Sequence, residues 1–412
     1  MSLRDALLAA LASVPGTRTF HVHVLVSTPK KHYNLFPFAT PRPKTFLQHI
    51  LVLLAEETAD SPRVFVSAIE AFLYHVPSTS SAVLYISKVD STGQAMAPSP
   101  TPVLVRGLLR YYVDPASRPL PVAHLWVHLF ARAQNQYLFP NSAEYPGKRP
   151  LSDVKLCAWW KRQLSIVAEE VRARVETCRL YYLLPGLGEV EATHAVDRVY
   201  AAATSVPWRY GHPYGEMDVG VPCPIGRGGH IGHVVPWFDD DPKARFLDEI
   251  AYTTDANGVR SPERKRPRTS GAREDAESGT SEPEEATKAL RKVTVEEFWE
   301  RMSFRQECVA GAMTGFFVML TSSAVASAGG EGGEVSAQVV KRVLASLMTG
   351  HEFASCERAV WSTGVLEESI RGLCGQVDGS IGVSNPDEAR KEREVATQIT
   401  VLTARRKKRA RI

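Results

Sequence analysis

The run from Ser152 to Arg179 constrains the fold of this chain more than any other segment. Large apolar side chains recur in it at every third or fourth position, which is the spacing of one buried helix face. These side chains are Leu156, Trp159, Trp160, Leu164, Val167 and Val171. The run therefore predicts a long helix with one face against a core.

Two further segments predict strands, because each is rich in β-branched residues with alternating polarity. They are Thr19 to Ser27 and Ser81 to Ser87. Between them, Thr45 to Glu57 carries apolar residues at helical spacing and predicts a second helix. Strands mixed with long helices favour an α/β fold whose central sheet is covered by helices.

A break in composition interrupts the chain. Residues 255–287 are rich in Ser, Pro, Gly, Glu and Arg, so we expect a disordered loop that cannot offset its ordering entropy. Beyond it, Val293 to Leu320 is again predicted to be helical, and Cys308 to Gly330 predicts a buried core helix rather than a membrane span. We expect one domain over residues 1–412, with the loop 255–287 inserted and a basic tail at 404–412.

Two cationic runs, Arg264 to Arg268 and Arg405 to Arg411, stand out from a chain whose formal net charge is only +4. Such runs are typical of nuclear import signals or of patches for nucleic acid or an acidic protein. A solvated charge cluster is the simpler alternative. We expect a nuclear protein without sequence-specific nucleic-acid binding or membrane attachment.

The six cysteines stand singly, which argues against a zinc site and for a reducing compartment.

The compact acidic cluster Asp239, Asp240 and Asp241 lies directly before Pro242 and close to Arg245. One interpretation is a helix N-terminus, because acids favour the positive end of the helix dipole and proline suits the first turn. The other is an active-site cluster in which one aspartate handles a proton and the arginine binds a phosphate. Both interpretations can hold together.

Aromatic and basic residues alternate between Tyr137 and Arg149, ahead of the Trp159–Trp160 pair. Such a segment would suit a ligand with a ring, phosphates and a narrow apolar arm, although aromatic stripes are more often core. Ser87 to Gly93 reads by itself as a turn after a strand. The chain lacks a Walker A loop, a dinucleotide-binding glycine motif, a G-x-S-x-G elbow and an H-E-x-x-H motif.

Read in order, several short motifs together resemble the fungal Rtt-type histone H3 lysine acetyltransferases. The motifs are S-K-V-D-S-T-G from Ser87, Q-Y-L-F-P-N-S from Gln136, the double tryptophan, P-W at Pro207, and D-D-P-K-A-R-F from Asp240. This family shares the fold of the metazoan CBP-type acetyltransferases. The resemblance therefore implies a central mixed sheet surrounded by helices.

The resemblance also implies a set of site residues. It places the substrate acetyl-CoA against Asp90, Phe139, Ala143, Tyr145, Arg149, Pro150, Leu151, Trp159 and Arg245. Trp160 would face the acetyl group and the substrate lysine, and Asp240 and Asp241 would form a catalytic acidic pair. Lys243 falls on a lysine that such enzymes acetylate on themselves. No metal is implied.

The chemistry explains these residue types. A lysine amine has an ordinary pKa near 10.4, so presenting it uncharged at neutral pH costs about 4 kcal/mol. Asp241 could accept that proton, and the indole of Trp160 would favour the neutral amine by desolvation.

The resemblance implies histone H3 with histone H4 as substrate, and histone chaperones of the NAP type and the anti-silencing type as partners. It also implies work in replication-coupled nucleosome assembly and the DNA damage response. One alternative is an inactive nuclear scaffold that holds histones or DNA. Another is an acetyltransferase that acts mainly on non-histone proteins.

Overall fold

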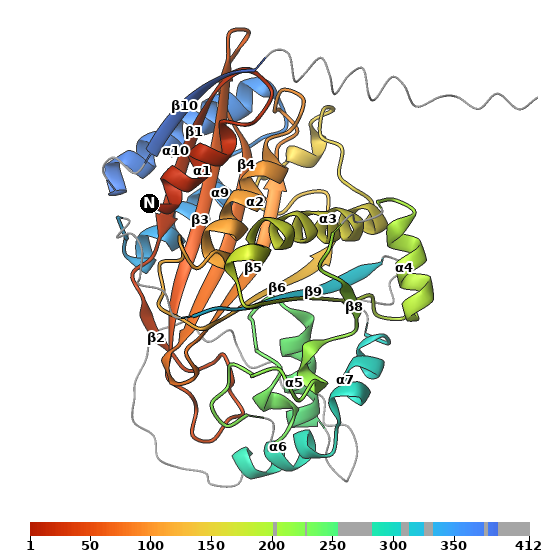
Figure 1. Ribbon diagram of the computed structural model, residues 1–412. Coiled ribbons are helices and arrows are strands. Elements are labelled where there is room, and N and C mark those ends of the chain that lie inside the picture. The colour runs from red at the N-terminus through yellow and green to blue at the C-terminus, as the bar shows by residue number, and fades with distance from the viewer. Residues whose placement is uncertain are drawn as a thin grey trace, which may run out of the picture.

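A twisted sheet runs through the described part of the chain (Figure 1). The computed structural model describes residues 1–200, 204–226, 229–253, 282–305, 313–324, 333–374 and 378–385. Ten strands lie in this part: β1 (Gly16–Val26), β2 (Lys30–His32), β3 (Thr45–Thr58), β4 (Ser61–Val76), β5 (Ser81–Ser91), β6 (His124–Arg132), β7 (Thr177–Leu183), β8 (Trp208–Tyr210), β9 (Thr314–Ser322) and β10 (Asp378–Asn385). Their order in the sheet is β10-β1-β3-β4-β5-β6-β9-β7-β8, and β2 pairs with β3 beside this path.

The sheet is mixed. β5 pairs with β6 in parallel, as β7 does with β8, and the remaining pairs are antiparallel. Parallel neighbours need a crossover connection, and the connection between β5 and β6 contains the helix α2.

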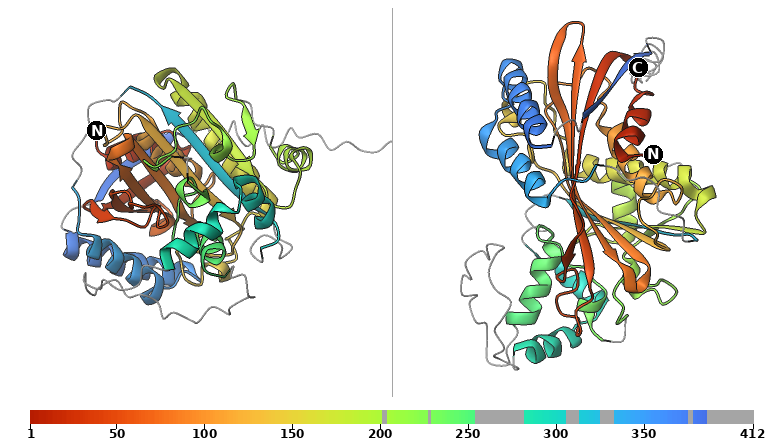
Figure 2. Two further views of the ribbon diagram at one scale, coloured as in Figure 1. Left: turned by 90° about the horizontal axis from the view of Figure 1, so that it is seen from below. Right: turned by 90° about the vertical axis from the view of Figure 1, so that its left-hand side faces the viewer.

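Helices cover both faces of the sheet (Figure 2). α1 to α3 lie on one face, α9 and α10 lie on the opposite face, and α5 to α7 gather at one end of the molecule. The helices are α1 (Leu3–Leu11), α2 (Thr101–Val113), α3 (Asp153–Val171), α4 (Glu189–Asp197), α5 (Pro242–Thr253), α6 (Glu282–Arg291), α7 (Val295–Met302), α9 (Ala337–Gly350) and α10 (Cys356–Cys374). The α/β class with a central mixed sheet surrounded by helices is thus confirmed.

Two apolar cores lie on the sheet, and β6 contributes to both because its side chains alternate between the faces. Leu125, Val127 and Leu129 belong to the larger core, together with residues of α1 to α3. Trp126 belongs to the smaller core, which α5 and α7 complete.

The predicted helix Thr45 to Glu57 is wrong, since these residues form most of strand β3. Residues 50–55 are all fully buried, because helices cover both faces of this part of the sheet. A strand buried on both faces has a nearly continuous apolar run, which also contains matches to helical spacing. Pairing with β1 and β4 decided between the two structures.

Two other predicted helices are too long. The helix predicted for Ser152 to Arg179 ends at Val171, and the chain enters strand β7 at Thr177. The helix predicted for Val293 to Leu320 is confirmed only over α7, because the chain from Thr314 forms β9 between β6 and β7. The buried core helix predicted for Cys308 to Gly330 is wrong over Thr314–Ser322, which form β9, while residues 308–312 and 325–330 lie outside the described residues.

The two expected strands, Thr19 to Ser27 and Ser81 to Ser87, are confirmed within β1 and β5, except that β1 ends one residue earlier, at Val26. Most of the expected loop 255–287 lies outside the described residues, as does the tail 404–412. Residues 282–287 at the end of the expected loop belong to α6.

Candidate active site

A splay between two parallel strands creates the space for a site. β5 and β6 pair in parallel only from Ser81 opposite His124 to Ile86 opposite Leu129. Beyond that point β5 stays paired with β4 as far as Ser91, and β6 with β9 as far as Arg132. Along the facing edges of the two strands, backbone N–H and C=O groups beyond this point do not hydrogen-bond from one strand to the other.

A β-bulge marks the same point. On β4, Ala71 pairs with Ile86 and Glu70 pairs with Lys88, so Ser87 is the extra residue of β5. A bulge bends its strand and re-aims side chains, and bulges are frequent beside active sites. Here it brings Ser87 and Lys88 to the same side of the sheet, where both approach Asp240. The expected turn from Ser87 to Gly93 is therefore mostly strand.

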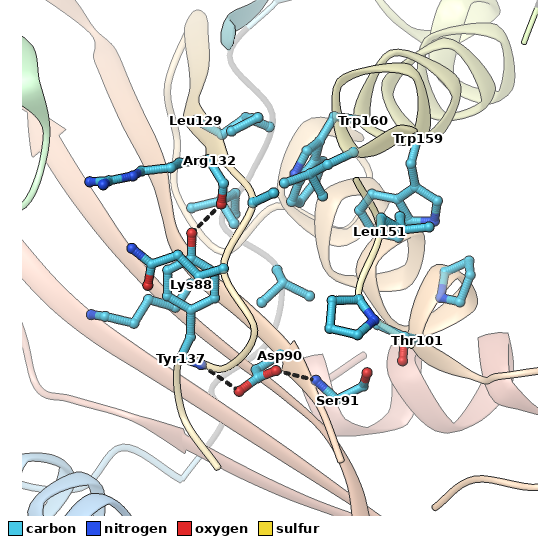
Figure 3. Close-up of a pocket in the computed structure, with 18 of the residues that line it drawn as sticks. Lys88, Asp90, Ser91, Thr101, Leu129, Arg132, Tyr137, Leu151, Trp159 and Trp160 are labelled. Atoms are coloured by element: carbon cyan, nitrogen blue, oxygen red, sulfur yellow. Dashed lines mark hydrogen bonds between the residues drawn. The ribbon is translucent and has the colours of Figure 1, made fainter. Parts of the chain in front are cut away.

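A pocket of about 330 Å³ fills the splay (Figure 3). Its walls are residues 86–91 of β5, residues 129–134 at the end of β6, the start of α2, residues 148–151, and the first turns of α3. Tyr137 completes the lining, so the pocket is assembled from stretches of sequence that only the folded sheet and its helices bring together.

The two sides of this pocket differ in chemistry. Leu151, Trp159 and Trp160 form an apolar wall, with the two indole rings edge to face at 4.8 Å. Lys88 and Arg132 lie on the opposite side of the pocket, with their charged ends directed away from the indole wall (Figure 3). The pocket therefore combines an apolar surface with cations that can bind phosphate or pair with a carboxylate.

Asp90 organises one wall of the pocket. Its Oδ2 accepts hydrogen bonds from the backbone amides of Tyr137 at 2.7 Å and Leu138 at 2.8 Å, and from the amide of Phe139 at 3.2 Å. Its Oδ1 accepts one from Lys148 Nζ at 2.9 Å. Asp90 is only 7% exposed, so its charge serves to fix the loop and the lysine that line the pocket.

The acidic cluster lies directly before α5, which begins at Pro242 as the helix-terminus interpretation predicted. Asp241 is completely buried and forms an ion pair with the Lys243 side chain, and it also accepts a 2.8 Å hydrogen bond from the Lys243 amide. Burial raises the pKa of Asp241 and lowers the pKa of Lys243, while each charge acts in the opposite direction on its partner. Asp241 and Lys243 are therefore each other's charge partner inside the smaller core.

Asp240 occupies a different position. Its side chain is 38% exposed, and its Oδ2 accepts a 2.5 Å hydrogen bond from Ser87 Oγ. Lys88 Nζ lies 3.7 Å from the same oxygen. Since Ser87 and Lys88 line the pocket, Asp240 is the carboxylate of the cluster that stands at its rim.

The predicted site residues divide into two groups. Six line the pocket: Asp90, Arg149, Pro150, Leu151, Trp159 and Trp160. Phe139 is buried behind the wall with its ring 4.8 Å from that of Phe353. Tyr145 Oη lies 3.5 Å from Cys356 Sγ, and Ala143 and Arg245 are exposed away from the pocket lining. The roles given to all these residues stay predictions.

Sequence reasoning missed Lys88, Arg132 and the start of α2 as parts of the wall. Lys88 stood inside a quoted motif, but nothing showed that a bulge would turn it toward an aspartate 152 positions later. It also missed Glu70, a buried acid within an otherwise apolar strand. A carboxylate in such a run was the available signal, because buried charges are usually paired.

Among the described residues, no group of three or more His, Cys, Asp or Glu side chains is placed to hold a metal ion. In the same part of the chain, no helix has both the length and the apolar character that crossing a membrane requires.

Comparisons with known proteins agree with one another. A family model of the histone acetyltransferase KAT11-type domain matches residues 117–398. Histone acetyltransferase rtt109 of Aspergillus flavus is 29% identical over 291 residues, which are 62% of this chain and 45% of that protein. Histone acetyltransferase rtt109 of Schizosaccharomyces pombe is 24% identical over 319 residues, 74% of this chain and 69% of that protein. The chain thus spans about half of the first relative and about two thirds of the second.

A solved structure gives an independent comparison of the fold. The crystal structure of Rtt109 from Aspergillus fumigatus superposes with a TM-score of 0.68 over 94% of this chain and 100% of that one. The two sequences are 23% identical, so this likeness concerns the fold alone.

Proposed function

The chain belongs to the KAT11-type histone acetyltransferases, and from that premise we propose that it transfers an acetyl group from acetyl-CoA to lysine side chains of histone H3. One observation carries the proposal. The splay between β5 and β6 holds a pocket with an apolar indole wall, and an aspartate stands at its rim. Such a site can hold a thioester beside a group able to receive the proton of an attacking amine.

The pocket fits the chemistry of acetyl-CoA. Beyond Ile86 and Leu129, backbone groups of β5 and β6 that are not used in pairing these two strands can hydrogen-bond the amides of the pantetheine arm. Trp159, Trp160 and Leu151 offer apolar contact to the arm and to the acetyl group. Arg132 and Arg149 are exposed cations at the pocket that can pair with phosphates. For Arg245, phosphate binding rests on the family resemblance alone.

The reaction forms an N–C bond between the acceptor amine and the thioester carbonyl carbon, and then breaks the C–S bond. The leaving group is the thiolate of coenzyme A, and the amine nitrogen loses one proton.

The sequence favoured Asp241 as the group that takes this proton. We propose Asp240 instead, because Asp241 is fully buried in its ion pair whereas Asp240 faces solvent at the pocket rim. Asp241 then fixes the start of α5 through Lys243. Positioning of the two reactants supplies most of the rate, since the thioester is already activated.

The finer assignments rest on the family resemblance. We propose newly synthesised H3 in complex with H4 as the substrate. We also propose stimulation by histone chaperones of the NAP type and the anti-silencing type, and a nuclear role in nucleosome assembly and the DNA damage response. An inactive scaffold is disfavoured, because a scaffold has no need of a pocket that aligns cations, indoles and an aspartate.

Labelled acetyl-CoA tests the proposal. The purified chain is incubated with an H3–H4 complex, alone and with each chaperone class, and the acetylated sites are mapped. We expect Asp240→Asn to lower kcat about a hundredfold or more with little change in acetyl-CoA affinity, because a positioned base typically contributes at least about a hundredfold. Asp60→Asn makes the same charge change on the exposed β3–β4 turn and serves as the control. No label on any histone under any condition would overturn the proposal and favour the scaffold.

A further inference from the structure

A buried carboxylate stands behind the pocket rim. Glu70 on β4 lies directly opposite Lys88 on β5, and its Oε2 is 2.6 Å from Lys88 Nζ. Its other oxygen, Oε1, is 2.9 Å from His49 Nε2 on β3. The Glu70 side chain is only 4% exposed, so both of its oxygens have partners away from bulk water. The three residues form a continuous chain of contacts across three neighbouring strands.

Lys88 lies between two carboxylates that compete for it. Its ammonium is 2.6 Å from Glu70 but 3.7 Å from Asp240, and it also donates to Ser87 Oγ at 3.2 Å. The shorter contact is the charge-assisted hydrogen bond, whereas the longer one lies at the limit of an ion pair. The lysine is therefore bound to Glu70 and only adjacent to Asp240.

We propose that Glu70 is a positioning residue for the acetyl transfer proposed above: it holds Lys88 on its own carboxylate and so leaves Asp240 available to the acceptor lysine. This inference rests on the proposed function. Without the Glu70 carboxylate, the Lys88 ammonium has Asp240 as its nearest anion and needs to move by only about 1 Å to make a close hydrogen bond. Asp240 would then be neutralised by an internal cation, and the acceptor would meet a positive charge at the rim.

The surroundings of Glu70 suit this role. His49 binds Oε1 and stacks on Phe72 with ring centroids 4.5 Å apart, which orients the carboxylate so that Oε2 faces Lys88. Burial acts to raise the pKa of Glu70, but the His49 hydrogen bond and the Lys88 charge outweigh it and hold this pKa below its ordinary value. Glu70 is therefore an anion at neutral pH, as the restraint of a cation requires.

A set of three variants tests the proposal in the full chain: Glu70→Gln, Lys88→Met, and the double variant. Gln keeps the shape and the contact with His49 but removes the charge, and Met keeps the length of the lysine without its cation. For each variant we would measure kcat and KM for the histone acceptor, the acetyl-CoA Kd by calorimetry, and the Tm.

We expect Glu70→Gln to raise the acceptor KM or lower kcat so that kcat/KM for the acceptor falls about tenfold, with acetyl-CoA Kd changed less than about twofold. The double variant should recover most of the lost activity, since no cation remains to neutralise Asp240. A double variant as impaired as Glu70→Gln, or a Glu70→Gln enzyme with unchanged acceptor kinetics, would overturn the inference. A lower Tm without a selective fall in kcat/KM for the acceptor would show that the role of Glu70 is purely structural.

A crystal structure of Glu70→Gln adds a readout that does not depend on activity. We expect Lys88 Nζ to move within hydrogen-bonding distance of Asp240. If Lys88 moves but the wild-type chain acetylates no histone, the proposed function fails while the restraint by Glu70 stands. If the wild-type chain is active and Lys88 stays in place, the restraint fails and the proposed function stands.

Discussion

Gly93 shows how one residue shapes the pocket from outside it. It follows β5 with a φ of +81°, and a Cβ atom there would lie 2.4 Å from Lys148 Cα. The two nearest atoms belong to the Lys148 backbone, so they cannot move aside as the end of a flexible side chain would. Because Lys148 and Arg149 line the pocket, any side chain at Gly93 must displace part of its wall.

We therefore predict that Gly93→Ala weakens acetyl-CoA binding about tenfold or more and destabilises the fold by about 1–2 kcal/mol from the left-handed backbone alone. Calorimetry and urea unfolding measure the two effects. Gly186→Ala separates them, because Gly186 has a φ of +86° with no atom within 4 Å of the added Cβ. It should share the loss of stability without the loss of affinity. Equal binding defects in both variants would contradict the account.

Lys243 is a second test at the scale of one residue. It is 2% exposed, and its ammonium lies 4.6 Å from the ring of Phe316, which in turn packs at 4.8 Å against Phe130 of the pocket wall. Lys243 is thus connected to the pocket wall through these two aromatic rings. Acetylation would remove its charge and its ion pair with Asp241.

We predict that mass spectrometry finds Lys243 acetylated in active enzyme made in bacteria, and unmodified or much less modified in the Asp240→Asn variant. Lys243→Arg keeps the positive charge but cannot form the neutral acetylated side chain. We therefore expect it to lower kcat while changing the stability of the fold little. An unmodified Lys243 in active enzyme would show that the role carried over from the family is wrong for this chain.

At the scale of elements, α10 is held against the sheet by a buried polar cluster. Glu367 of α10 lies 2.9 Å from His23 of β1 and 3.3 Å from Arg63 of β4. Burial acts to raise the pKa of Glu367, but the His23 hydrogen bond and the Arg63 charge outweigh it and hold the pKa below the ordinary value of 4.5. A carboxylate with a lowered pKa contributes stability above its unfolded pKa and loses it as the pH falls through the folded pKa.

We predict that Glu367→Gln destabilises the protein by about 1.5–3 kcal/mol at pH 7, since it weakens hydrogen bonds to a charged group. The difference from wild type should shrink as the pH falls below 4.5. Urea unfolding at a series of pH values measures it. The exposed neighbour Glu368→Gln is the control and should change little at any pH. A defect of Glu367→Gln that is the same at pH 7 and pH 4 would argue against an ionic anchor.

At the scale of the whole molecule, the sheet joins both ends of the described chain, since β10 pairs with β1. The family match begins at residue 117, yet β1 to β5 and one side of the pocket precede it. The pocket therefore depends on residues outside the matched region. The expectation of one domain over residues 1–412 stays a prediction.

We predict that a fragment of residues 117–412 shows no cooperative thermal unfolding and does not bind acetyl-CoA. It would lack β5, and β6 would then expose its parallel edge and much of the apolar surface buried in the larger core. A chain of residues 1–385 contains every described strand and should unfold cooperatively. Calorimetric scans of the two fragments measure the difference, and a cooperative transition in residues 117–412 would contradict it.

Local patterns were enough to predict the strands within β1 and β5, the start of the long helix α3, and the helix that begins at Pro242. These features depend on neighbours in the chain, such as alternation, helical spacing and a proline after acidic residues. The family motifs added six residues that line the pocket, because their identities are local as well.

By itself, then, the sequence determined the α/β class, the family and much of the pocket wall. Only the tertiary structure decided that Thr45 to Glu57 is a strand, that the bulge at Ser87 turns Lys88 toward Asp240, and that Asp241 rather than Asp240 is buried. The physical reason is the same in each case. Strand pairing, burial on both faces and charge contacts each join residues that are distant in sequence. The spacing of residues along the chain does not indicate which distant residue will be the partner.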